Sequence, residues 1–341
     1  MIFKYTYIHH DDAEKMQAFV KHIVLDVWCN AKGKRFDLNK VTNENDFRKK
    51  VARTKVTLKK PIHDIFKICA KFNSYQLDAV KEAFEKNNAI EKLCKNEVSP
   101  IFYKDLSSKT NHVFTKKVKA FFDQLYDDVF NQIPFNLNKH YDDFFATNDT
   151  ICPFCGIEEL EATAKIHRED YDHYLPKSEY PFNAVNLQNL LPMCTKCNQY
   201  YKKNKNPIFR SRKQTKAYFY YSDIDPDLKI TMEINNIESC NVKVKFSSHD
   251  MCEEVKTWDY LFNLTHRYPQ TICNEHIGLG WYREVYNSGK MPNPMTPQKV
   301  IENAVWYAKE NPLDNKAFLK APFLQACLEK GLFDDKSPKI S

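Results

Sequence analysis

Two cysteine pairs of the form CxxC constrain the fold of this sequence more than any other feature. Cys152 and Cys155 form the first pair, and Cys194 and Cys197 form the second after 38 intervening residues. Cysteines three positions apart can bend onto one ion, and two such pairs complete a tetrahedral site of four sulfurs. The chain has eleven cysteines, and we expect no export signal, so a disulfide framework is improbable. The sequence therefore predicts a structural zinc ion held by these four cysteines.

Hydrophobic residues recur with helical spacing on both sides of the cysteine-bearing stretch, for example at Met16, Phe19 and Ile23. Residues 229–234 and 242–246 instead alternate polar and apolar side chains across a turn-rich connection, which predicts a β-hairpin. We therefore expect a mostly helical α+β fold. Its predicted parts are a helical N-terminal domain at 1–148, a central module at 149–214, and a C-terminal domain at 215–341 in which the hairpin precedes helices.

Positive charge gathers in two stretches of the chain. Residues 48–60 contain seven Lys or Arg and residues 196–216 contain eight, and neither stretch contains an acidic residue. Because the whole chain has a net charge of only +7, the remainder is net negative. Concentrated basic segments are typical of a surface that binds a polyanion, with a solvated helix face as the alternative.

Several classes of protein are excluded by what the sequence does not contain. Glycine occurs only six times, and neither the GxGxxG nor the GxxxxGK[ST] motif is present, which excludes the common dinucleotide-binding and P-loop folds. No apolar run approaches the roughly 18 residues of a membrane-spanning helix. We expect a cytoplasmic protein that does not contact a membrane.

The stretch between and after the cysteine pairs carries the candidate catalytic residues. In order, it contains Asp172-His173, Pro176, Asn189-Leu190, Pro192, Asn198 and several trailing lysines. With the cysteines, these residues resemble the motif of the HNH endonuclease family over about residues 152–206. The flanking regions resemble no family that we identify. The resemblance implies a ββα-metal core, in which a hairpin and a helix hold one divalent ion, and it implies hydrolysis of DNA.

The resemblance also implies a role for each polar residue of the motif. Asp172 corresponds to the metal-binding acid and His173 to the general base. Asn189 corresponds to the asparagine that braces the hairpin loop and orients the histidine, and Asn198 to a metal ligand on the helix. The chain departs from the family in the loop after Pro176, where Lys177-Ser178-Glu179-Tyr180-Pro181 replaces a glycine-rich segment. A loop without those glycines is stiffer, so we expect its path, and not the chemistry, to differ from that of the family.

The residue types support the same chemistry independently. Phosphodiester hydrolysis needs an activated water, a metal ion and positioned ligands. A carboxylate oxygen of Asp172 suits Mg²⁺ or Mn²⁺, and a neutral imidazole can accept a proton from water near neutral pH. If the second cysteine pair begins a helix, Asn198, Lys202 and Lys205 share one face. The expected nucleic-acid contacts are Lys177, Lys202, Lys203, Lys205, Arg210 and Arg212.

These observations predict a metal-dependent HNH endonuclease that hydrolyses DNA phosphodiester bonds, with structural Zn²⁺, catalytic Mg²⁺ or Mn²⁺, and double-stranded DNA as its partner. The alternative is a non-catalytic zinc-finger adaptor that only binds nucleic acid. Several features stay open: a role as effector nuclease in prokaryotic defence against phage, control by an activator such as a partner ATPase, a homodimer, and RNA as substrate.

The remaining cysteines carry weaker signals. His249 with Cys252, and Cys273 with His276, have ligand-like spacing, so a second zinc site stays open. We expect the other cysteines to be small buried hydrophobic residues. They are Cys29, Cys69, Cys94, Cys240 and Cys327.

Overall fold

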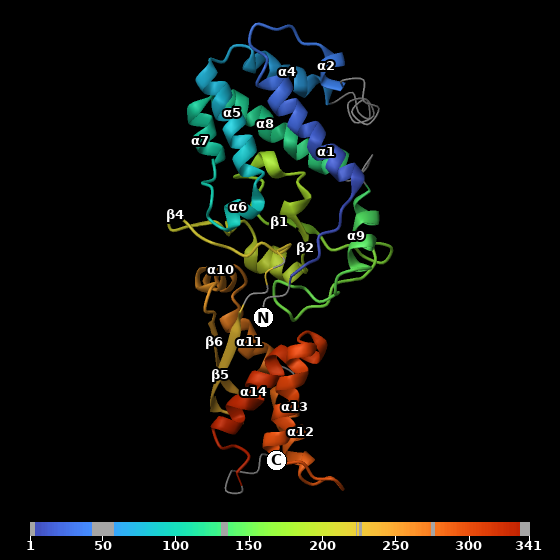
Figure 1. The fold of residues 1–341 in the computed structure, drawn as a ribbon, viewed down its shortest axis with the longest axis vertical. Coiled ribbons are helices and arrows are strands. Elements are labelled where there is room, and N and C mark those ends of the chain that lie inside the picture. Colours follow the sequence, from blue (N-terminus) through green and yellow to red (C-terminus); the bar gives the residue numbers. More distant parts are fainter. Residues whose placement is uncertain are drawn as a thin grey trace.

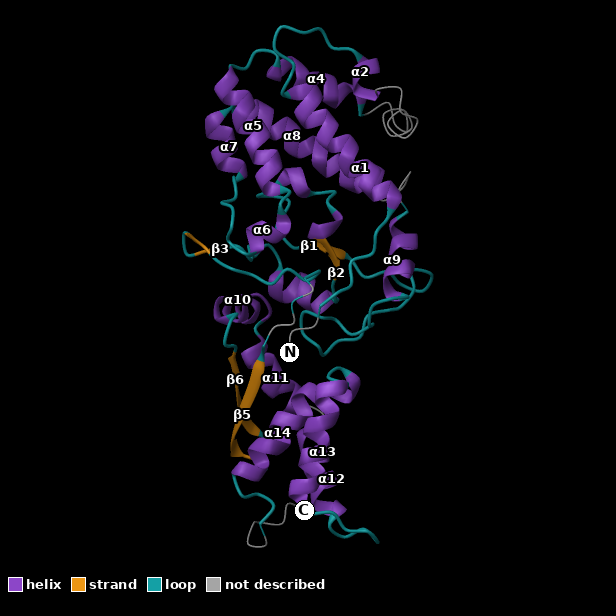
Figure 2. Ribbon diagram, viewed as in Figure 1, coloured by secondary structure: helices purple, strands orange, loops and turns teal. Residues whose placement is uncertain are grey.

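The computed structural model describes residues 4–42, 58–130, 136–222, 224, 227–273 and 277–334. Helices predominate in these ranges, and their named strands form three two-stranded antiparallel sheets, which confirms the predicted α+β, mostly helical class. The molecule is elongated (Figures 1 and 2). N-terminal helices occupy one end, the C-terminal hairpin and helices occupy the other, and the central module lies between them. The described ranges contain no helix long and apolar enough to cross a membrane.

The N-terminal region is built from helices that bury one face each. They are α1 (Asp11–Lys21), η1 (His22–Trp28), α2 (Leu38–Thr42), α4 (Lys59–Cys69), α5 (Ser74–Asn87), α6 (Ile90–Cys94), α7 (Tyr103–Lys109), α8 (His112–Gln124), η2 (Leu125–Phe130) and α9 (Leu137–Phe145). Aromatic residues fill the core between them, and Phe19, Trp28 and Phe122 are fully buried. The basic residues predicted at 48–57 lie outside the described residues.

Asparagine side chains cap the starts of three of these helices, α5, α8 and α9, and at α9 Asn136 accepts a hydrogen bond from the Lys139 backbone at 3.1 Å. Asn73 accepts a hydrogen bond from the backbone of Gln76, whose side chain in turn accepts one from the Asn73 backbone, so α5 starts with a reciprocal cap. Asn111 accepts a hydrogen bond from the Phe114 backbone at the start of α8. The Asn111 cap thus fixes the start of α8, a helix that also contributes to the pocket described below.

The central module contains little regular structure. Its elements are β1 (Tyr171–His173), η3 (Pro181–Asn183), η4 (Leu187–Asn189), β2 (Leu190–Pro192), η5 (Lys196–Lys202), β3 (Phe209–Arg210) and β4 (Lys213–Gln214). Strands β1 and β2 pair antiparallel, with Asp172 opposite Leu191 and His173 opposite Leu190. Both leucines are buried, so the apolar strand β2 anchors the polar strand β1. The π-helical segment η5 begins within the second cysteine pair, and Cys197 is its second residue.

The C-terminal region begins with the predicted hairpin, which is confirmed. Strands β5 (Lys229–Asn236) and β6 (Asn241–Ser247) pair antiparallel. The helices that follow are α10 (Cys252–Phe262), α11 (Leu264–Cys273), α12 (Ile277–Ser288), α13 (Pro297–Glu310), η7 (Asp314–Lys316) and α14 (Ala317–Glu329). Helix α11 packs against β6 and α14 against β5, and Ile234, Val242 and Val244 of the hairpin are buried.

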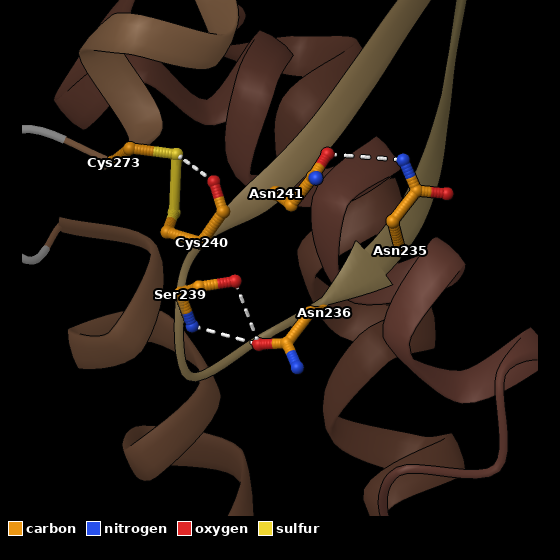
Figure 3. Close-up of a disulfide and its surroundings, with 6 residues drawn as sticks. All are labelled: Asn235, Asn236, Ser239, Cys240, Asn241 and Cys273. Atoms are coloured by element: carbon orange, nitrogen blue, oxygen red, sulfur yellow. Dashed lines mark hydrogen bonds between the residues drawn. A yellow bond between two sulfur atoms is a disulfide. The ribbon is translucent and has the colours of Figure 1, made fainter.

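A disulfide joins the tip of this hairpin to the end of α11 (Figure 3). Cys240 and Cys273 are bonded, with their Cα atoms 5.4 Å apart, a normal separation for a disulfide. Asn236 shapes the turn because its Oδ1 accepts hydrogen bonds from the backbone N–H and the hydroxyl of Ser239. The expectation that Cys240 is a free buried thiol was therefore wrong. The packing of α11 on the hairpin brings two cysteines together that lie 33 residues apart in sequence.

Candidate functional site

The two CxxC pairs meet in one buried cluster, here called the tetracysteine centre. The sulfurs of Cys152, Cys155, Cys194 and Cys197 all lie within 4.8 Å of one another, a spacing that suits four sulfurs bound to one zinc ion at about 2.3 Å each. All four residues are buried, so the donor set is closed and leaves no open position for a substrate. The centre fits a structural metal site, as predicted.

Local backbone geometry brings each pair together. In the first pair, Gly156 adopts φ +65° and donates its N–H to the Cys152 carbonyl at 2.7 Å, which folds the chain back on itself. In the second pair, the Cys197 N–H lies 3.4 Å from Cys194 Sγ at the start of η5. Burial raises the pKa of the Cys152 and Cys197 thiols. A bound cation would offset this by favouring the thiolates.

A second site, here called the His173 pocket, opens beside β1. It is a depression of about 370 Å³. Its polar lining residues are Lys119, Asp172, His173, Lys177, Ser178, Asn198, Gln199, Lys203 and Asn204. The fold thus gathers five of the sequence-predicted site residues (Asp172, His173, Lys177, Asn198 and Lys203) around one opening. The first three come from β1 and the loop after it, and the other two come from η5 and its end.

The imidazole of His173 has a defined tautomer in this pocket. Its Nε2 lies 3.0 Å from the carbonyl oxygen of Ala184. Because a carbonyl can only accept a hydrogen bond, Nε2 carries the proton and Nδ1 keeps its lone pair. Burial, with smaller contributions from the positive charges of Lys177 and Lys202, lowers the pKa of His173 to about 3, and the hydrogen bond to Ala184 opposes this shift. The ring is therefore neutral near pH 7, and the Tyr126 ring packs edge-on against it at 4.5 Å.

The carboxylate of Asp172 is buried and already has a cationic partner. Lys202 Nζ donates a hydrogen bond to Asp172 Oδ1 at 3.1 Å and lies 2.8 Å from Oδ2, a distance of an ion pair without hydrogen-bond geometry. The same ammonium donates to the His173 carbonyl at 3.1 Å. Burial raises the pKa of Asp172, and the Lys202 charge opposes that rise. Lys202 is 1% exposed and faces Asp172, so the predicted contact with nucleic acid would require the ammonium to leave this pair.

Asn189 holds the loop that follows His173. Its Oδ1 accepts a hydrogen bond from the Leu175 N–H at 2.7 Å, and its Nδ2 donates to the Leu175 carbonyl at 3.0 Å. The Asn189 carbonyl also accepts from the Tyr174 N–H at 2.9 Å. With no exposed surface, Asn189 cannot contact a substrate. It instead fixes the backbone next to His173.

The other predicted cations have different environments. Lys177 forms ion pairs with Asp127 at 3.3 Å and Asp123 at 3.7 Å, while Lys203 lines the pocket. Lys205 donates to the carbonyls of Tyr260 and Leu261 at 2.8 and 3.2 Å.

The predicted stripe of Asn198, Lys202 and Lys205 was wrong at Lys205. Lys203 has φ +50°, which ends η5 at Lys202 and turns the chain away. Arg210 packs over the Tyr260 ring at 4.8 Å, and Arg212 is exposed in the turn between β3 and β4.

The sequence did not identify the wall that α8 adds to the His173 pocket. Lys119 of α8 lines the pocket, and Tyr126 of η2 contacts His173. Asp123, one turn beyond Lys119, forms an ion pair with it at 2.5 Å. No motif marks these residues, and the only signal was the apolar face of the same helix at Val118 and Phe121, which is buried. The polar face opposite that core forms the wall.

The suggested second metal site is contradicted by the disulfide. Cys273 is bonded to Cys240 and is unavailable as a ligand. His249 pairs instead with the neighbouring Asp250 at 2.6 Å, and His276 lies outside the described residues. Within the ranges that the structure describes, the tetracysteine centre is the one group of three or more His, Cys, Asp or Glu residues that could hold an ion.

Comparison with known proteins gives one partial similarity to report. The chain is 29% identical to Protein ea31 of Escherichia phage lambda over 116 residues, which is 34% of this chain and 36% of that protein. The chain therefore spans about a third of the length of this curated relative. No family model matches the chain. No solved structure matches it either.

Proposed function

We propose that this protein is a metal-dependent endonuclease of the HNH type that hydrolyses DNA phosphodiester bonds. The observation that carries the proposal is the neutral imidazole of His173, with Nδ1 free to accept a proton, in one pocket with Asp172 and Asn198. A general base beside oxygen donors that can hold a divalent ion suits metal-assisted hydrolysis. The strand pair β1–β2 and segment η5 would form the hairpin and helix of the nuclease core.

Three residues of the pocket and the buried Asn189 beside it have distinct tasks in this proposal. Asp172 and Asn198 would hold Mg²⁺ or Mn²⁺, which supplies positive charge for the phosphate oxygens. His173 Nδ1 takes a proton from the attacking water, while the Nε2 hydrogen bond to Ala184 keeps the ring oriented. Asn189 keeps the following loop in place.

Cations at the opening suit a phosphate backbone. Lys119 and Lys203 both line the pocket, and Lys119 comes from α8 rather than from the central module. Lysine contacts with phosphate give affinity that falls with salt and does not depend on sequence. We therefore expect the N-terminal helices to take part in holding the DNA next to His173.

The alternative adaptor function is favoured by one observation. Lys202 neutralises Asp172 in a buried ion pair, so this carboxylate must release an ammonium before it can bind a metal ion. A pair of this kind would also exist in a zinc-stabilised domain that binds nucleic acid without cutting it. Cleavage assays separate these two functions.

The test is nicking of supercoiled plasmid by the full chain in Mg²⁺ or Mn²⁺. Loss of a general base costs about 10²–10⁴-fold in rate, so His173→Ala should lose cleavage by that factor while keeping its zinc. His249→Ala is the matched control, because that histidine is exposed and lies outside the pocket. Cleavage by His173→Ala at the wild-type rate would contradict the proposal. Zinc-loaded wild type that binds DNA but cuts with neither metal would support the adaptor function.

A further inference from the structure

Arg267 of α11 is buried against the tetracysteine centre. It is 5% exposed. Its Nη1 donates to Cys197 Sγ at 3.2 Å and to the Phe262 carbonyl at 3.4 Å. The guanidinium also lies over the Tyr201 ring, 4.3 Å from its centroid. A residue of the C-terminal region thus contacts a sulfur of the central module directly.

A buried guanidinium needs a negative partner. Arginine stays charged inside proteins, and an isolated buried charge is costly unless it is paired. In the part of the chain that the structure describes, no carboxylate lies within 4.0 Å of Arg267 to form an ion pair. The remaining source of negative charge beside it is the cysteines. Four thiolates around one divalent cation carry a net charge of −2, which a guanidinium at 3.2 Å would partly balance.

Two neighbours of Arg267 contact the other cysteine pair. Trp258 of α10 donates its indole N–H to the Phe154 carbonyl at 2.8 Å. Tyr268 of α11 donates its hydroxyl to the Cys155 carbonyl at 3.0 Å. Both side chains are buried. Helices α10 and α11 therefore contact the backbone of the first pair and a sulfur of the second.

We propose that Arg267 is the counter-ion of an anionic metal–tetrathiolate centre, and that metal binding is thereby coupled to the docking of α10 and α11 on the central module. Arg267 acts as a positioning residue in this role, because it contacts a ligand atom and not the metal. The proposal goes beyond the nuclease function and does not depend on it. A protein that binds DNA without cutting it would need the same coupling.

The first test measures zinc affinity of the full chain by competition with a chromogenic chelator. Arg267→Gln keeps N–H donors but removes the charge. Losing a partner of a metal ligand typically weakens metal binding by about 10–100-fold, and we expect a loss in that range. Arg267→Lys keeps the charge and should lose less. Lys256→Met is the control, because it removes an exposed cation from α10 and should leave zinc affinity unchanged. Wild-type affinity in folded Arg267→Gln would overturn the proposal.

The second test uses only the wild type, so it holds even if a variant fails to fold. Hydrogen exchange is followed in peptides from residues 150–160 and 252–273, with zinc bound and after its removal by a chelator. Coupling predicts that α10 and α11 lose protection together with the first cysteine pair. If residues 150–160 open while α10 and α11 keep their protection, the docking does not depend on the metal and the proposal is overturned. Neither test measures cleavage, so an inactive nuclease would leave both results interpretable.

Discussion

The two sites of the central module differ in how they are completed, although both use segment η5. Cys197 lies near its start, in the closed tetracysteine centre, and Lys202 is its last residue, beside the open His173 pocket. The C-terminal helices cover the centre through Arg267. The N-terminal helix α8 walls the pocket through Lys119.

This difference indicates a division of labour between the two flanks. Residues around the tetracysteine centre are buried and hydrogen-bonded to backbone or sulfur, so their replacement should affect folding and metal content first. Residues at the opening of the His173 pocket, such as Lys119 and Lys203, are charged, so their replacement should affect the proposed DNA cleavage first. Three predictions test how far this division holds.

Removing one sulfur should have the largest effect. Structural zinc contributes about 10–16 kcal/mol of apparent binding free energy in small zinc domains, and a Cys155→Ser variant loses a quarter of the donor set. We expect zinc content to fall well below one per chain and the thermal unfolding midpoint to drop sharply. Cys252→Ser is the control, because Cys252 is exposed and free. A Cys155→Ser variant with full zinc content would show that the centre does not hold the fold.

Replacing the Asp172–Lys202 pair tests whether residues of the pocket also stabilise the fold. Asp172→Asn leaves the Lys202 ammonium buried without its counter-charge, and breaking a buried pair in this way costs about 3–5 kcal/mol of unfolding free energy. The double variant Asp172→Asn with Lys202→Met should recover most of that loss, while cleavage stays absent in both. Urea denaturation measures the difference. Equal stability of Asp172→Asn and wild type would mean that the pair contributes nothing to the fold.

Acid should weaken the fold through the buried histidines. Burial lowers the pKa of His140, which lies 2.7 Å from the Tyr171 hydroxyl, to about 4, and that of His173 to about 3. An unfolded histidine titrates near pH 6.5, so below that pH the unfolded chain binds protons that the folded chain does not. Each histidine then removes about 2 kcal/mol of unfolding free energy between pH 7 and pH 5.

Urea denaturation across this pH range, with zinc content monitored, measures the slope. His140→Gln should flatten it by roughly half if the two histidines contribute equally. A slope that does not change in His140→Gln would assign the acid sensitivity to other groups.

The features that the sequence predicted correctly are those that short residue patterns determine. The three-residue spacing of each cysteine pair predicted the tetracysteine centre, and the alternation at 229–234 and 242–246 predicted the hairpin. The bend within each cysteine pair and the alternation along each strand depend on local backbone geometry, which short patterns record directly, and four sulfurs are the number that completes one zinc site.

Contacts between distant segments could not be predicted in the same way. Arg267 lies 70 residues beyond Cys197, the residue whose sulfur it contacts, and Lys119 reaches the pocket from a helix that shows only an apolar period in the sequence. The stripe failed at Lys205 because one backbone angle at Lys203 ends η5. The disulfide depended on how α11 packs against β6, which neither cysteine's neighbours reveal.

Lys202 gives the His173 pocket a cation of its own. Since its ammonium already neutralises Asp172, this pocket can form before a divalent ion binds at Asp172. In the proposed nuclease, loading Mg²⁺ or Mn²⁺ is then an exchange of one positive charge for another, and the ammonium must move aside each time. Such an exchange would set a concentration of free metal ion below which the site stays inactive. The activity of the proposed nuclease would then be controlled by the supply of metal ion and not by the amount of protein.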